Sequence, residues 1–80
     1  MPTLFRSGPY RFFFYSDYGD GAEPPHVHVE RDDKIAKFWL HPVRLQESDG
    51  FNRVEIGRLQ GIVEENLETL VRSWEAYFGN

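Results

Sequence analysis

The stretch EPPHVHVERDDKIAKFWL, residues 23–40, contains the pattern that decides the fold. Apolar and polar residues alternate on both sides of Asp32-Asp33, which is typical of two antiparallel strands joined by a tight turn. Pro25 cannot donate a hydrogen bond to a sheet ladder, so we expect the first strand to begin after it. The sequence therefore predicts a β-hairpin, which Pro42 closes at its far end.

An even-length loop centred on Asp32-Asp33 sets the register of the two strands, with His28 opposite Lys37. Opposed residues project from the same face, and the faces alternate along each strand. One face then carries an apolar set: Val27, Val29, Ala36 and Phe38. The other face carries a mixed set: His26, His28, Lys37 and Trp39, flanked by Glu30 and Ile35. A shift of one residue would mix the two sets, so the pattern supports this register.

The N-terminal segment predicts another hairpin. The stretches TLFR and YRFFFYS flank Gly8-Pro9, a dipeptide typical of turns. One face of the second strand is assigned to the core: Tyr10, Phe12 and Phe14. The other face is placed beside the histidines: Arg11, Phe13 and Tyr15. Both faces of the sheet are therefore expected to be partly apolar.

The C-terminal third predicts one long helix, from Arg53 to Phe78. Asn52 is suited to the N-cap, Glu55 would complete a capping box, and Gly79 is placed to end the helix. Apolar residues recur at helical spacing within about 120° of the circumference, which predicts one buried stripe. They are Ile56, Leu59, Val63, Leu67, Leu70, Val71, Trp74, Tyr77 and Phe78.

A straight helix of this length would extend past the sheet. Residues 53–78 would span about 39 Å, whereas the predicted strands span about 20 Å. Gly57 and Gly61 each cost a helix about 1 kcal/mol relative to alanine. We therefore expect either a bend near these glycines or a partner beneath the far end, and a second copy of the chain is the simplest partner.

Together these elements predict a single α+β domain over residues 1–80. A small antiparallel sheet of three to four strands, within residues 3–45, would pack on the one long C-terminal helix, residues 53–78. Residues 43–45 are the candidate for a short edge strand. The sequence shows no internal repeat and no linker that would divide it into two domains.

The composition excludes several classes of protein. The chain has no cysteine, so disulfides, zinc ribbons and thiol chemistry are excluded. No stretch is as long as the run of about 20 apolar residues that a membrane helix needs. The N-terminal residues do not show the basic segment followed by an apolar segment that is typical of a signal peptide. We expect a cytoplasmic protein with no membrane partner and no cofactor. The formal net charge of −4 disfavours nucleic acid as a partner, because basic side chains make most phosphate contacts.

The face that carries the histidines suggests two chemical hypotheses. His26 and His28 could ligate a metal, with Asp17, Asp20 and Glu23 upstream, although Lys37 opposite His28 would repel a divalent cation. Alternatively the face could bind RNA through basic groups beside aromatic rings, or cleave it by general acid–base catalysis. That candidate binding face comprises His26, His28, Lys37, Trp39, Arg11, Phe13 and Tyr15.

A protein–protein interface is the hypothesis that we favour for this face. Phe13, Tyr15, Ile35 and Trp39 are expected to be exposed together, and aromatic residues are the usual interface anchors. The sequence has no GxSxG elbow and no glycine-rich phosphate loop, which disfavours a nucleophilic enzyme. We therefore expect a homodimer or an assembly with a small protein partner that covers this face.

The whole chain resembles a bacterial family of domains of unknown function, family 4160. The resemblance rests, in order, on MPTLFR, YRFFFYS, EPPHVHVER, AKFWLHPVRL, GF and IVEENLETLVRSWEAYFG. Its proline–histidine and tryptophan motifs match Pro24, Pro25, His26, His28, Trp39 and Trp74. The resemblance implies a gene that lies beside that of another small protein, as in a toxin–antitoxin-like pair, and hence a cytoplasmic protein partner. The family carries no established activity, so the resemblance implies no mechanism.

Overall fold

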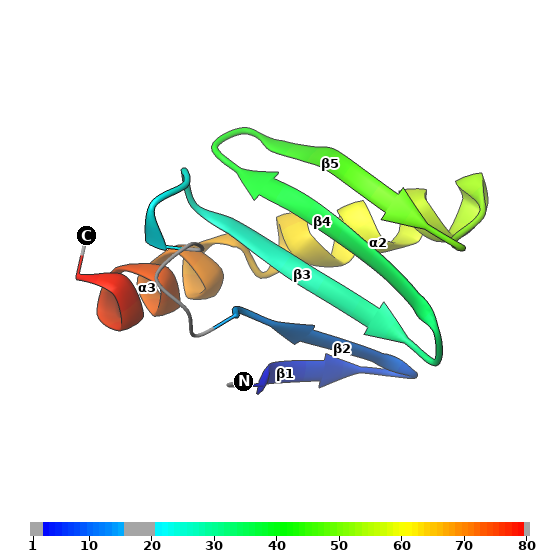
Figure 1. Cartoon of the computed structure of the whole chain (residues 1–80), viewed down its shortest axis with the longest axis horizontal. Helices are drawn as coiled ribbons and strands as arrows, with labels where there is room; N and C mark the ends of the chain where they lie inside the picture. The colour runs from blue at the N-terminus through cyan, green and yellow to red at the C-terminus, as the bar shows by residue number, and fades with distance from the viewer. Residues whose placement is uncertain (1–2, 16–20, 80) are drawn as a thin grey trace.

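The computed structural model describes residues 3–15 and 21–79 of the chain. Five strands form one antiparallel sheet in chain order: β1 (Thr3–Ser7), β2 (Tyr10–Phe13), β3 (His26–Arg31), β4 (Lys34–Leu40) and β5 (Val43–Asp49). Two helices follow the sheet: α2 (Arg53–Glu65) and α3 (Leu67–Phe78). Figure 1 looks onto the sheet, with α2 passing behind it and α3 at the end where β3 begins. The predicted α+β class is confirmed.

Both predicted hairpins are present, and each is closed by a tight turn. The turn between β1 and β2 lies at Gly8-Pro9, and the turn between β3 and β4 lies at Asp32-Asp33. Gly8 and Asp32 both adopt a φ of 57°, in the left-handed region that glycine and aspartate tolerate best. Between β3 and β4 the predicted register is confirmed from Glu30–Ile35 to His26–Trp39.

The sheet is larger than the three to four strands predicted within residues 3–45. β5 continues to Asp49, well beyond the edge strand expected at residues 43–45. Only Val43 and Leu45 of this strand pack against the core, because the rest of β5 is an exposed sheet edge. An exposed edge needs few apolar residues, so alternation in the sequence marks only the first half of β5.

The single long helix predicted over residues 53–78 is wrong, because Asn66 divides it into α2 and α3. Asn66 adopts φ −109° and ψ 16°, and its side-chain amide donates to the Ile62 carbonyl oxygen at 2.8 Å. Such side-chain bonds compete with regular helical geometry. A straight helix of about 39 Å would be longer than the molecule, whose longest dimension is 33 Å. The expected bend therefore exists, but away from Gly57 and Gly61.

The buried stripe of the helices matches the prediction in most positions. Leu59, Val63, Leu70 and Trp74 are buried in one core with Val27, Val29, Ala36 and Phe38 of the sheet. Tyr77 was expected in the stripe but is 46% exposed. Both helices therefore cover the apolar face predicted from the hairpin, and the face of His28 and Lys37 is the open one. Of the helices in the described ranges, none is long and apolar enough to cross a membrane.

A polar cluster attaches the start of α2 to the sheet. The Asn52 side-chain oxygen caps the helix by accepting from the Glu55 backbone N–H at 2.8 Å, as predicted. The Glu55 carboxylate does not complete the expected capping box. It accepts from the Tyr10 hydroxyl at 3.1 Å and pairs with the Arg31 guanidinium at 3.1 Å. The other helix end is as predicted, since Gly79 adopts a φ of 79° and its N–H donates to Glu75.

Candidate functional site

The open face of the sheet brings three of the predicted site residues, Phe13, His28 and Lys37, into one row across the strands. Phe13 of β2 pairs with His28 of β3, His28 with Lys37 of β4, and Lys37 with Glu47 of β5. The neighbouring row contains Arg11, Glu30, Ile35 and Asp49. Paired residues share a face, so the two rows form a continuous surface. The predicted pairing of His28 with Lys37 is therefore confirmed, and β2 adds Phe13 and Arg11 to the same surface.

An aromatic cluster occupies the β2–β3 side of this face. The ring of His28 stacks on Phe13 with centroids 5.5 Å apart, and it meets Tyr15 edge-on at 4.5 Å. Phe13 and Tyr15 also meet edge-on, at 5.2 Å. Offset stacking and edge-to-face contacts are the favoured arrangements of aromatic pairs. Tyr15 is half-buried, so its ring forms the part of the aromatic cluster that solvent can reach.

Phe13 was expected to be exposed, and the two histidines were expected to be exposed beside Lys37 and Trp39; all three expectations are wrong. Phe13 is 1% exposed, His28 is 7% exposed and His26 is fully buried. Aromatic rings pack against both histidines, and a charged side chain covers Phe13. The Arg11 guanidinium lies 4.1 Å from the Phe13 ring centroid, held there by Glu30 and by a 2.9 Å bond to the Thr3 hydroxyl.

His26 is a packing residue and not a surface residue. It begins β3, at the end of the sheet where α3 lies (Figure 1), so it contacts elements from both layers. Its ring lies 4.9 Å from Trp74 of α3 and 5.7 Å from Trp39 of β4. The Nδ1–H donates to the Pro24 carbonyl oxygen at 2.8 Å. His26 is therefore removed from the predicted contact face, although the register had placed it there.

Lys37 is held by two neighbours. Its Nζ lies 2.5 Å from the Glu23 carboxylate and 4.9 Å from the centroid of the Trp39 ring. Both contacts draw the ammonium toward the end of β4 that carries Trp39. Lys37 is thus paired with an acid and stacked on an aromatic ring, and Glu23, predicted as a possible metal ligand, is the partner of this cation instead.

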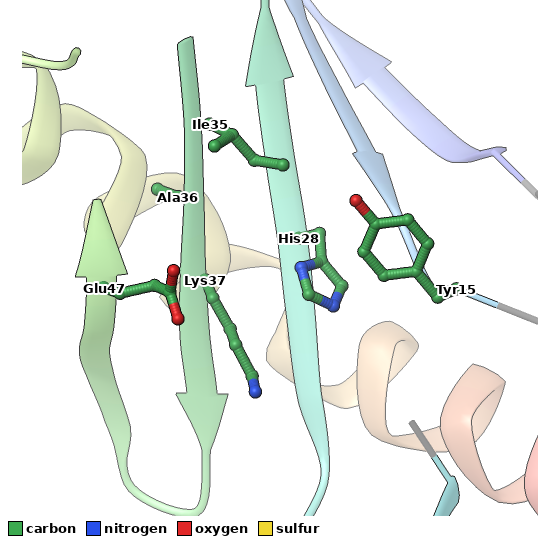
Figure 2. Close-up of a pocket in the computed structure, with 6 residues that line it drawn as sticks. All are labelled: Tyr15, His28, Ile35, Ala36, Lys37 and Glu47. Carbon is green, nitrogen blue, oxygen red and sulfur yellow. The ribbon is translucent and has the colours of Figure 1, made fainter. Parts of the chain in front are cut away.

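A pocket of about 180 Å³ lies in the open face. It is lined by Tyr15, His28, Ile35, Ala36, Lys37 and Glu47. Figure 2 shows the His28 ring between Tyr15 and the Lys37 side chain, with Glu47 on the far side of β4. For scale, a protein cavity of about 150 Å³ holds a benzene molecule. The pocket therefore has room for one side chain or a small ligand, between an aromatic wall and an acidic one.

Glu47 is the site residue that sequence reasoning missed, and a β-bulge explains why. Counting back from the turn at the cis His41-Pro42 bond would place Gln46 opposite Lys37. The register shifts by one residue between Lys37 and Phe38, so Glu47 takes that position. A bulge on an edge strand leaves little trace in one sequence, and β5 was predicted to end before this point.

The described residues provide no metal centre. Within residues 3–15 and 21–79, no three His, Asp or Glu side chains gather closely enough to hold a metal ion. His26 and His28 lie with their rings 5.1 Å apart and edge-on, and each packs against other aromatic rings. Asp17 and Asp20, the other candidate ligands, lie outside the described residues.

The comparison with protein families agrees with the resemblance noted in the sequence. The family model described as "Domain of unknown function (DUF4160)" matches residues 10–75, which is most of the chain. The chain belongs to this family. No curated protein and no solved structure matches it. The matched range extends from β2 into α3, and so includes the whole pocket lining.

Proposed function

We propose that this chain is a protein-interaction module that binds a small cytoplasmic partner protein through the open face of its sheet. The observation that carries the proposal is the pocket of about 180 Å³ on the face that α2 and α3 leave uncovered. Half-buried Tyr15, Ile35 and Trp39 lie on the same face. Partly exposed aromatic and aliphatic side chains around a hollow are typical of surfaces that anchor a partner's side chain.

The charges on this face support a protein partner over RNA. Arg11 pairs with Glu30, and Lys37 pairs with Glu23, so neither cation is in excess. Glu47 adds a further carboxylate to the pocket wall. Phosphate contacts supply most of the affinity of RNA-binding surfaces, and carboxylates among the basic groups oppose them. Binding or cleavage of RNA, the alternative function, therefore has less support, and buried His26 could not take part in it.

A toxin–antitoxin-like pair is the setting that we propose for the partner. This part rests on the family resemblance, which implies a small protein encoded beside this one. The net charge of −4 favours a binding or neutralising role within such a pair over that of a ribonuclease. The partner would then cover the open face and fill the pocket.

The test is a gentle affinity purification of the tagged chain from its native cells, with two variants beside the original. Ile35→Ser alters the pocket wall, and Val54→Ser alters an α2 side chain that is 71% exposed. We expect a stoichiometric partner with the original chain and with Val54→Ser, and its loss with Ile35→Ser. Equal recovery from both variants, or recovery of nucleic acid alone, would contradict the proposal.

The mass of the isolated chain in solution tests whether a second copy of the chain binds this face. Light scattering at high concentration should give 9.4 kDa, the mass of one chain. A larger mass that returns to one chain in Ile35→Ser would make a second copy the partner of this face.

A further inference from the structure

We infer that the pocket on the open face receives an arginine side chain of the partner protein. The inference rests on the proposed function, because it names the residue chemistry that the same face would bind. It is drawn from three features of the pocket: a carboxylate with no ionic partner among the residues that the structure describes, an aromatic wall, and a cation that is already neutralised.

The carboxylate wall is formed by β5. Glu47 is exposed, lines the pocket, and makes no ion pair or side-chain hydrogen bond with any described residue. Asp49 lies two residues further along the same face, opposite Ile35, and is likewise exposed without such a partner among the described residues. Two acidic groups at one rim, in a chain of net charge −4, favour a basic side chain. A guanidinium can bond a carboxylate through two parallel N–H groups.

The opposite wall is aromatic. Tyr15 and His28 line the pocket, and their rings are 4.5 Å apart. A planar guanidinium stacks on such rings more readily than an ammonium does. The same sheet face already contains this packing, because the Arg11 guanidinium lies 4.1 Å from the centroid of Phe13. Ile35 between the two walls offers an apolar contact for the methylene groups of the incoming side chain.

The positive charge of Lys37 would repel a cation that enters the pocket. The contacts of its ammonium group reduce this repulsion. Its ammonium is paired with Glu23 at 2.5 Å and lies over Trp39. Figure 2 shows that the end of this side chain points along the strand, away from Ile35. The part of Lys37 nearest Ile35 is therefore its methylene chain, and Glu47 is left as the uncompensated charge of the pocket.

The test uses short blocked peptides and the backbone amide signals of the isotope-labelled chain in NMR spectra. The probe is acetyl-Gly-Arg-Gly-amide, and its counterpart contains citrulline, which has the same shape without the charge. We expect the arginine peptide to shift the signals of His28, Ile35 and Glu47 in a saturable way, and the citrulline peptide to leave them unchanged. Equal shifts with both peptides, or none with either, would overturn the inference. Equally tight binding of a lysine peptide would overturn the choice of arginine.

Two charge variants locate the binding. Glu47→Gln should lower the affinity for the arginine peptide by about fivefold, which is the upper range for one exposed ion pair. Glu75→Gln removes an exposed carboxylate from α3 and should leave the affinity unchanged. Both variants raise the net charge by the same amount, so an equal loss of affinity would show a general charge effect and would overturn the assignment to the pocket.

The inference can fail separately from the proposed function. If Glu47→Gln binds the recovered partner with the affinity of the original chain while Ile35→Ser loses it, the interaction module stands and the arginine assignment falls. If Ile35→Ser retains the partner, the proposed function falls, whatever the peptides show.

Discussion

The two faces of the sheet bury aromatic rings by different means. Phe38 on the covered face is fully buried beneath apolar side chains of the helices. Phe13 on the open face is 1% exposed, but it is covered by Arg11, Tyr15 and His28, which belong to the sheet layer itself. Equal burial is therefore reached by a second layer on one side and by long charged and aromatic side chains on the other.

Phe38 and Phe13 are almost equally buried, but we expect their removal to change the free energy of unfolding by different amounts. A helix layer cannot move inward without disturbing the whole core, so a deletion beneath it leaves a cavity. We expect the side chains of Arg11 and Tyr15 to shift partly into space left below them, because no helix has to move with them. The open face should therefore tolerate change better, as a surface that adapts to a partner must. Deletion of one phenylalanine from each face tests this contrast.

Removing Phe38 should have the largest effect. We expect Phe38→Ala to lower the free energy of unfolding by about 3–5 kcal/mol, through lost apolar burial and a cavity under the helices. Urea denaturation followed by circular dichroism measures the change. Val54→Ala, at a site 71% exposed, should stay within about 0.5 kcal/mol of the original. If Phe38→Ala does not fold, Phe38→Leu should still cost about 1 kcal/mol, and no measurable loss would contradict the account.

The matched deletion on the open face should cost less. We expect Phe13→Ala to lower the free energy of unfolding by about 2–3 kcal/mol, below the range typical of a rigid core, because its cover can collapse. The same urea experiment compares it directly with Phe38→Ala. Equal losses would mean that the open face is a second rigid core, and the contrast drawn above would be wrong.

The polar cluster that attaches α2 tests the covered face in another way. Glu55→Gln should cost about 1–2 kcal/mol, because it leaves the partly buried Arg31 guanidinium without its counter-charge and weakens the bond from Tyr10. Glu65→Gln, at an exposed position of the same helix, should change little. Stability of the two variants is compared by thermal and urea unfolding, and indistinguishable values would show that this cluster does not hold the helix to the sheet.

The smallest effect should be a gain. Gly57 lies in α2, and a Cβ there would meet no other atom within 4 Å. Gly57→Ala should therefore raise the free energy of unfolding by about 0.5–1 kcal/mol through helix propensity. Gly79→Ala should have the opposite sign, because Gly79 ends α3 with a φ of 79°. A loss of stability in Gly57→Ala would show that this stretch of helix is held in a geometry that alanine resists.

The sequence alone predicted which residues share a face, but not which of them are buried. The pairing of His28 with Lys37 follows from a two-residue turn and strict alternation, which are both local features. The burial of Phe13 and His28 depends on where the side chains of Arg11 and Tyr15 rest. Arg11 is held by an acid 19 residues away in the chain. Such pairings have no periodic signature, so the predicted exposure was wrong.

The helix break and the acidic pocket wall escaped prediction for related reasons. The low helix propensity of Gly57 and Gly61 predicted a bend near them. Differences in helix propensity of about 1 kcal/mol are readily overridden by tertiary packing. The break occurs at Asn66, where a side-chain bond to Ile62 replaces regular geometry. Glu47 reached the pocket through a bulge that changes the register by one residue. The helix break and the β-bulge each occur at a single residue, but each changes the position of the residues that follow it in the chain.

The break at Asn66 also determines what tryptophan fluorescence can report. By turning α3 toward the start of β3, it places Trp74 beside His26, which Trp39 touches from the sheet. The chain has two tryptophans, so its emission comes from this one end of the molecule. The cluster of Glu55, Arg31 and Tyr10 joins α2 to β2 and to the opposite end of β3, and it contributes no tryptophan signal. An emission change that precedes the loss of far-ultraviolet dichroism would therefore time the release of α3 separately from unfolding of the remaining domain.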